Sequence, residues 1–183
     1  NIAEIESMSH AAAPPVPQRV SEPVLLMMMQ EMVATIERTI PSSETNKETA
    51  ALAVHTKLEA LGYDVGYRYI ERVAQQRLIS SEPLEAIKLI CKELWQSVFG
   101  KSIDKLQTNH RGIFVLKDNS FRWIARHSGK SDVSVKQMQM KSLKFPTGLI
   151  RGALANLGYA AVVTADVDTV DSRQTTSFHI KLT

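Results

Sequence analysis

Side chains that could bind a metal ion or act as a nucleophile are scattered along this chain. The five histidines are far apart, and none has a carboxylate, a thiol or a second imidazole at metal-ligand spacing; they are His10, His55, His110, His127 and His179. The single cysteine, Cys91, lies on the apolar stripe of a predicted helix, where a thiol behaves as a small hydrophobic group. We therefore expect neither a catalytic group nor a metal site.

The patterns that suggest a cofactor are incomplete. Asp166, Asp168 and Asp171 alternate near a predicted loop, but the ligand series and closing glutamate of an EF-hand are absent. Gly62 and Gly66 match neither the dinucleotide-binding pattern G-x-G-x-x-G nor the P-loop pattern G-x-x-x-x-G-K. The sequence therefore predicts no cofactor.

Two pairs of glycines lie in predicted helical segments, Gly62 with Gly66 and Gly148 with Gly152. A glycine inside a helix is unfavourable by about 1 kcal/mol relative to alanine, so its repeated use needs a reason. A missing side chain lets a neighbouring backbone come close. Both segments are therefore predicted to make close contacts.

The composition indicates a sizeable core and no requirement for nucleic acid. Of 183 residues 44% are hydrophobic, which is ample for one domain of roughly 150 residues and a tail. A net charge of +3 is far from the dense basic stripes that bind a phosphate backbone. One cysteine permits no internal disulfide, and neither a signal sequence nor an apolar run of bilayer length is visible. We expect a soluble intracellular protein.

Cationic residues are concentrated between residues 122 and 151, where only Asp132 opposes them. A solvated surface is the preferred interpretation, because aromatic residues do not interleave regularly with these charges. Attraction to an anionic membrane is the alternative interpretation of this basic region.

Residues 1–23 are predicted to form a disordered tail, since four prolines stand among alanine, serine and glutamate without an apolar period. Residues 24–183 are then a single domain. Its first helix begins at Val24 and is apolar over more than one stripe, which would leave Met27 or Met28 exposed on an isolated domain. Either a second protein surface covers this helix, or the helix lies inside one core.

Three more helices are expected before residue 101. A break at residues 41–43 separates the first helix from a second, which ends at Gly62. Asp64 caps a third helix. Residues 81–83 begin a fourth, which ends or kinks at Gly100.

Beyond Gly112 the period changes from helical to strand-like. Residues 113–116 and 121–126 are predicted to form a hairpin around the turn at 117–120. The rest of the chain is expected to form one helix and two strands, at residues 142–157, 160–167 and 175–182. This order predicts an α+β fold in which helices pack against a small antiparallel sheet of about four strands.

Four separated motifs carry a family resemblance: residues 58–72 (LEALGYDVGYRYIER), 87–95 (IKLICKELW), 108–113 (TNHRGI) and 148–158 (GLIRGALANLG). Together they resemble the small core subunits of the TRAPP vesicle-tethering complex, most of all the thirty-three-kilodalton type. The resemblance covers nearly everything from Val24 to Leu182 in the same order.

The resemblance implies a non-catalytic structural subunit of a complex that exchanges guanine nucleotide on a Rab-type small GTPase in ER-to-Golgi and Golgi vesicle traffic. It implies a cytoplasmic protein, peripheral on Golgi and ER–Golgi membranes. Family members pair with a paralogous subunit through their first two helical regions. The interface residues that this implies are Leu25, Leu26, Met29, Met32, Val33, Gly62, Tyr63 and Gly66.

The partner that the resemblance implies first is a paralogue in which a cysteine after the glycine-containing helix carries a palmitoyl chain. Residues 73–81 of this chain contain no cysteine, so acylation is not expected here. The alternative function is a homodimeric peripheral membrane or lipid-binding module that uses the basic residues 122–151.

Overall fold

The computed structural model describes residues 21–40, 47–75, 82–109, 111–125, 127, 131–170 and 173–183. The predicted tail up to residue 20 and the predicted helix break at 41–43 lie outside these ranges. Helices and a four-stranded antiparallel sheet make up the described part of the chain, which confirms the predicted α+β fold class.

The first two helices are α1 (Glu22–Thr39) and α2 (Lys47–Ala74). Pro23 stands in the first turn of α1, where the backbone N–H that proline lacks would have no helical partner. The predicted division of α2 at Gly62 was wrong, and the helix expected from Asp64 onward is part of α2. Gly62 is buried against another helix, and this packing outweighs its low helix propensity.

The next helical segment has three parts: α3 (Pro83–Leu89), the π-helical turn η2 (Ile90–Leu94) and α4 (Trp95–Phe99). Pro83 begins the segment and Gly100 ends it with a left-handed φ of 76°, as predicted. The Ile103 N–H donates to the carbonyl of Cys91 in the wide turn of η2, at 2.9 Å. This bond ties the helical segment to the chain that enters the sheet.

The sheet contains β1 (Lys105–Thr108), β2 (Ile113–Asp118), β3 (Ala161–Val170) and β4 (Arg173–Leu182), in the order β1-β2-β4-β3. The structure confirms the strand that begins at Ile113 and the two final strands. The predicted hairpin with residues 121–126 was wrong, because β2 pairs with β1 on one side and with β4 on the other. Residue 126 itself lies outside the described ranges.

Residues 122–125 form a short helix instead, α5 (Arg122–Ala125). Phe121 before it is 2% exposed, and its ring centroid lies 5.8 Å from that of Trp95 and 5.7 Å from that of Phe178. The alternating aromatic residues therefore belong to a buried aromatic cluster and not to a strand. β1 was not predicted because Leu106 is its one apolar residue.

Two further helices are α6 (Asp132–Ser142) and α7 (Lys144–Asn156). α7 confirms the helix predicted over residues 142–157, and Gly158 follows it with φ 89°. α6 was not predicted, because most of its residues are polar and they show little amphipathic period. Its start is fixed by Ser131, whose Oγ accepts the backbone N–H of Ser134 at 3.3 Å.

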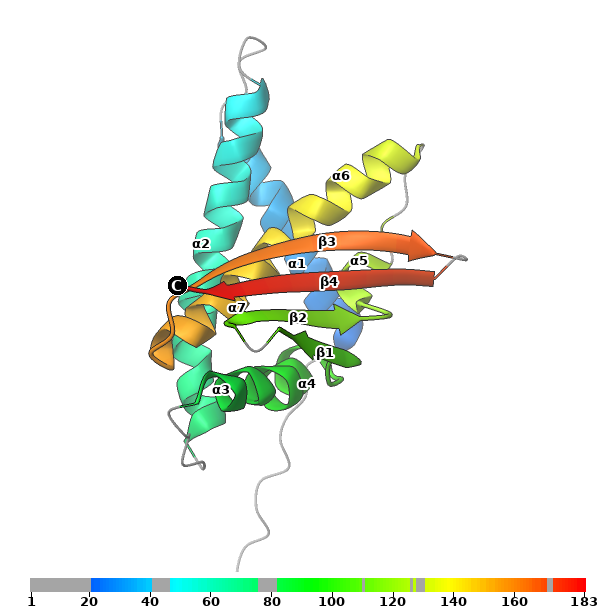
Figure 1. Ribbon diagram of the computed structural model, residues 1–183. Coiled ribbons are helices and arrows are strands. Elements are labelled where there is room, and N and C mark those ends of the chain that lie inside the picture. Colours follow the sequence, from blue (N-terminus) through cyan, green and yellow to red (C-terminus); the bar gives the residue numbers. More distant parts are fainter. Residues whose placement is uncertain are drawn as a thin grey trace, which may run out of the picture.

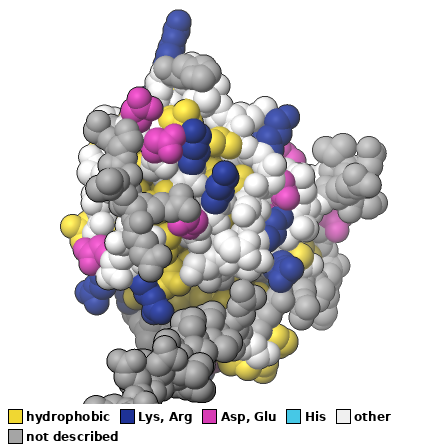
Figure 2. Space-filling model, turned by 90° about the horizontal axis from the view of Figure 1, so that it is seen from below, with side chains coloured by type: hydrophobic (Ala, Val, Ile, Leu, Met, Phe, Trp, Pro, Cys, Tyr) yellow, Lys and Arg dark blue, Asp and Glu magenta, His cyan; other side chains and the backbone are white. Residues whose placement is uncertain are grey.

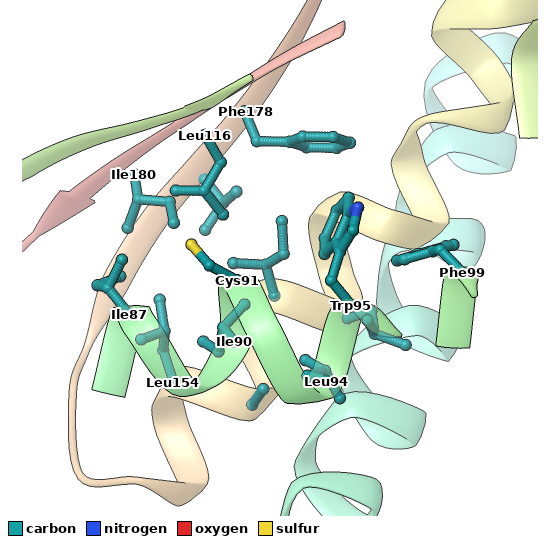
Figure 3. Packing of buried hydrophobic residues seen from close by; sticks show 14 of the residues in the cluster. Ile87, Ile90, Cys91, Leu94, Trp95, Phe99, Leu116, Leu154, Phe178 and Ile180 are labelled. Atoms are coloured by element: carbon teal, nitrogen blue, oxygen red, sulfur yellow. The ribbon is translucent and has the colours of Figure 1, made fainter. Parts of the chain in front are cut away.

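Figure 1 shows the sheet on one side of the molecule, with α1, α2 and α7 on the other. Figure 3 shows the side chains of α3, η2 and α4 against the sheet, where Ile87 and Cys91 approach Leu116 and Ile180. These four residues are at most 6% exposed. The main hydrophobic core therefore lies between the sheet and the helices.

A polar cluster is buried beside this core. The Trp95 Nε1–H donates to Asp118 Oδ2 at 3.0 Å, and Lys101 Nζ donates to Asp118 Oδ1 at 2.8 Å. The Asp118 side chain is fully buried, so these partners satisfy a carboxylate that would otherwise be costly to bury. The cluster fixes the position of α4 against β2.

Candidate protein interface

The two glycine pairs of the sequence meet each other in the structure, one on α2 and one on α7. A Cβ atom built on Gly62 would lie 2.1 Å from the carbonyl oxygen of Phe145, and one on Gly66 would lie 2.0 Å from that of Leu149. Gly148 and Gly152 face the carbonyl oxygens of residues 59 and 63 at 2.0 Å in the same way. The predicted close contact is confirmed, and we call these four residues the glycine seam.

Polar and aromatic contacts cross the seam. Arg151 Nη1 of α7 lies 2.8 Å from Glu59 Oε1 of α2, and its guanidinium lies 5.2 Å from the centroid of the Tyr63 ring. Tyr63 in turn stacks on Tyr67, with ring centroids 6.1 Å apart. The structure thus places Gly62, Tyr63 and Gly66 in a contact within this chain, and their role at a subunit interface stays a prediction.

The other flank of α2 is covered over only part of its length. Near the start of α2, Val54 and Leu58 are buried together with Ile36 of α1. Leu61 and Val65 continue the same face at spacings of three and four residues, yet they are 41% and 45% exposed. In Figure 1 the end of α1 lies close to the start of α2, and the two helices diverge towards their other ends. α1 therefore stops covering α2 beyond Leu58.

The same loss of cover occurs on α1. Met28, Met32 and Ile36 follow one ridge at spacings of four residues. Ile36 is buried, Met32 is half-buried, and Met28 is 62% exposed. We define the open face as Met28, Leu61 and Val65, the apolar residues that lose cover where the two helices diverge.

The interface residues predicted on α1 are only partly exposed. Met29 and Met32 pack against the main core, and Leu25, Leu26 and Val33 are also half-buried. The expectation that Met27 or Met28 would be exposed is met by both, at 68% and 62%. Leu61 and Val65 were missed, because their spacing from Leu58 is that of a buried helix face.

A groove with a volume of about 580 Å³ runs along the flank of α1 that faces α5, α6 and α7. Four of the predicted interface residues line it, namely Leu26, Met29, Met32 and Val33. The opposite wall includes Trp123, His127, Met138 and Phe145. His127 Nε2 lies 3.0 Å from Ser142 Oγ, and burial lowers the pKa of this histidine. The groove is mainly apolar. Among the described residues His127 Nδ1 has no hydrogen-bond partner, so the contact between His127 and Ser142 lacks the orienting group of a catalytic triad.

Cys91 is 6% exposed, and burial raises the pKa of its thiol to about 12. Within the described ranges, no three histidine, cysteine or acidic side chains gather closely enough to hold a metal ion. His10, His110 and Asp171 lie outside those ranges. None of the described helices has the length and hydropathy of a segment that crosses a bilayer.

Several cations of the basic region 122–151 have acidic partners. Lys141 Nζ pairs with Glu37 Oε1 of α1, and Arg151 pairs with Glu59. Arg126 and Lys130 lie outside the described residues. On the face seen from below in Figure 2, lysine and arginine are interspersed with acidic side chains. For the basic region itself, the two ion pairs fit the preferred interpretation, a mixed and solvated surface.

Comparison with known proteins identifies the family. The family model described as transport protein particle (TRAPP) component matches residues 25–183. Trafficking protein particle complex subunit 6B of Mus musculus is 39% identical over 150 residues, which cover 81% of this chain and 90% of the relative. Subunit 6A of Homo sapiens is 39% identical over 137 residues, which cover 75% of this chain and 83% of the relative.

Among solved structures, trafficking protein particle complex subunit 3 from Naegleria fowleri, covalently bound to palmitic acid, superposes with a TM-score of 0.65. It is 16% identical and the match covers 87% of this chain and 93% of that one, so it supports the fold alone. The residues that the family model matches include nearly all of the described helices and strands. The chain therefore belongs to the TRAPP family, among the small core subunits of this vesicle-transport complex.

Proposed function

We propose that this chain is a non-catalytic subunit that builds a TRAPP complex by pairing with a paralogous small subunit through the open face. The observation that carries the proposal is the divergence of α1 and α2, which leaves Met28, Leu61 and Val65 without cover. Exposed apolar side chains that continue the buried faces of two neighbouring helices offer what a partner helix requires.

The energetics favour a protein partner for this face. Removing an exposed leucine, valine or methionine side chain from water contributes roughly 1 kcal/mol or more for each residue. A pair of such faces supplies a hydrophobic centre, and the surrounding polar residues supply the rim. Met28 is also an adaptable side chain, which suits packing against a related but different subunit.

The first partner that we propose is an acylated paralogue, and the role of this chain is then geometric. A solved relative is covalently bound to palmitic acid, whereas residues 73–81 of this chain contain no cysteine. The assembled complex would hold a Rab-type GTPase during guanine-nucleotide exchange. It would act in the cytoplasm, on the surface of Golgi and ER–Golgi membranes.

The test is co-purification with the paralogous small subunits after Met28→Glu. A carboxylate at the centre of a pairing surface would be buried without a partner, so we expect the complex to be lost on size-exclusion chromatography. Because Met28 is 62% exposed, the melting temperature of the isolated chain should stay close to that of the wild type.

The matched control is Met27→Glu on the same helix. Met27 is 68% exposed, but it lies one residue from the Met28 ridge and borders the groove. Retention of the complex by Met27→Glu and its loss in Met28→Glu would support the open face. Wild-type pairing by Met28→Glu would refute its assignment.

A further inference from the structure

The groove beside α1 is an apolar surface that the open face does not include. Leu26 and Met27 of α1 form one wall, and Trp123 of α5 with Met138 of α6 form the other. Met138 is 45% exposed, and Trp123 is half-buried. The groove can therefore take apolar side chains from an additional segment.

The groove has a tied end and an entry end. The ion pair between Lys141 of α6 and Glu37 of α1 joins the two walls near the end of α1. Pro23 lines the groove at the start of α1, so the chain that precedes Ser21 arrives at the entry end. A preceding segment can fold back along α1 from this point.

The sequence before Ser21 has the composition that such a segment needs. Ile2, Ile5 and Met8 recur every three residues, with Glu4 and Glu6 between them. The charged groups that line the groove are Glu37, Arg122 and Lys141, a formal net charge of +1. The three apolar residues of this segment match the mainly apolar lining of the groove, and its two carboxylates meet only one acidic group there.

The lengths also match. The groove follows α1 from Pro23 to Glu37, which is about 21 Å at 1.5 Å per helical residue. Residues 2–8 in a polyproline II conformation, which brings every third side chain to the same side, span about 19 Å. The twelve residues 9–20 then remain for the reversal of direction, and they include Pro14, Pro15 and Pro17.

We propose that residues 2–8 of this chain dock into the groove between α1 and α6, with Ile2, Ile5 and Met8 as anchors. The segment covers Leu26, Met27 and Met138 and runs antiparallel to α1. This inference does not depend on the pairing of subunits, because Met28, Leu61 and Val65 of the open face do not line the groove.

Cross-linking tests the proposal in the full chain, alone and in the complex with its paralogues. Antiparallel docking places residue 2 at the tied end, and Met138 lies one helical turn from Lys141 at that end. Ile2→Cys combined with Met138→Cys should therefore be joined by a short bismaleimide, whereas Ile2→Cys with Val133→Cys should not. Val133 lies on α6 and is 69% exposed, but it does not line the groove. Cys91 is buried and should not compete for the reagent.

The expected result is a severalfold excess of the 2–138 cross-link within single chains. Equal yields at residues 133 and 138, or no cross-link at either, would overturn the proposal. Mixing isotopically light and heavy chains distinguishes a cross-link within one chain from a cross-link between two copies. Cross-links that join a light to a heavy chain would show that a second copy supplies the segment, and they would also overturn the proposal.

Fluorescence gives a second measurement that does not need cysteines. Deleting residues 1–20 should make Trp123 more accessible to acrylamide, and a synthetic peptide of residues 1–20 should restore its protection. Trp95 is fully buried and provides a constant background. A peptide with serine at positions 2, 5 and 8 is the control. If deletion does not change the acrylamide quenching of Trp123, or if the control peptide protects Trp123 equally well, the assignment of Ile2, Ile5 and Met8 as anchors is contradicted.

Discussion

The two flanks of α2 differ in how they are covered. On one flank the glycine seam brings the backbones of α2 and α7 into contact, and Arg151 closes over it. On the other flank α1 covers Val54 and Leu58 and then diverges from α2. The comparison shows that one helix can hold its own domain together on one side and leave apolar surface for a partner on the other.

The difference arises from side-chain size. Glycine permits an approach that no other residue allows, so the seam is specific for α7 and contributes to the stability of the chain itself. Met28, Leu61 and Val65 are flexible or branched apolar residues that need a complementary surface. Changes on the first flank should therefore act on folding, and changes on the second should act on assembly.

The largest effect is expected for Gly66→Leu in the seam. Its Cβ would lie 2.0 Å from the Leu149 carbonyl oxygen, so the helices must separate, at a cost of about 3 kcal/mol or more. Urea denaturation followed by circular dichroism measures this loss. Ala60→Leu, at an exposed position of α2, is the control and should change stability little. If Gly66→Leu unfolds at the same urea concentration as the wild type, the claim that the glycine seam stabilises the chain is contradicted.

Leu61→Asp on the open face should instead act on pairing. A buried, unpaired carboxylate should weaken partner binding by about 2–4 kcal/mol, while the isolated chain keeps its unfolding midpoint. Calorimetric titration with the paralogous subunit gives the affinity. Leu52→Asp is a matched control, since Leu52 is 64% exposed on the same helix but off the Leu58–Leu61–Val65 face. Equal losses in both variants would argue against a defined face.

Arg151→Met tests the polar closure of the seam. It removes the contacts with Glu59 and Tyr63 and keeps the aliphatic stem, so we expect a loss of about 0.5–1 kcal/mol in unfolding free energy. The ionic part of this loss should shrink at high salt. If stability in low salt is unchanged, the close backbone contact alone accounts for the seam.

The smallest effect is a pH dependence at His55 of α2. Burial, followed by the charges of Lys144 and Lys141, lowers the pKa of His55 from its ordinary value of 6.5. The unfolded chain binds this proton more readily, so the contribution is fully present above pH 6.5 and falls as the pH drops towards the lowered pKa. His55→Gln should flatten the loss of stability below pH 6.5 in thermal melts. If stability falls with pH as steeply in His55→Gln as in the wild type, another group causes the loss. His127 is a candidate, since burial also lowers its pKa.

Sequence reasoning found the parts of the fold that depend on strong local patterns. Alternating apolar residues predicted β3 and β4, and the paired glycines predicted the seam. The continuity of α2 could not be predicted, because packing against α7 overrides the low helix propensity of Gly62 and Gly66. The aromatic residues at 121 and 123 alternate as they would in a strand, but in the structure their rings pack in a buried aromatic cluster.

The candidate interface, too, could be predicted only in part from the sequence. Exposure of Met27 and Met28 could be predicted because α1 has more apolar residues than one stripe can bury. Exposure of Leu61 and Val65 could not, since their spacing is that of an inner helix face. Only the angle between α1 and α2 decides where the cover ends, and this angle depends on contacts far apart in the sequence.

The π-helical turn η2 has a consequence for insertions and deletions in this helix. It accommodates one residue more than an α-helical turn would, and Trp95 follows directly after it. Losing one residue between Ile90 and Leu94 would let this turn close as an ordinary α-helical turn, so the residues from Trp95 onward would keep their orientation. The indole would still reach Asp118, and the ring packing around Phe99 and Phe121 would be kept. The same deletion within α3 would instead rotate everything downstream by about 100°. A deletion should therefore be tolerated better in η2 than in α3.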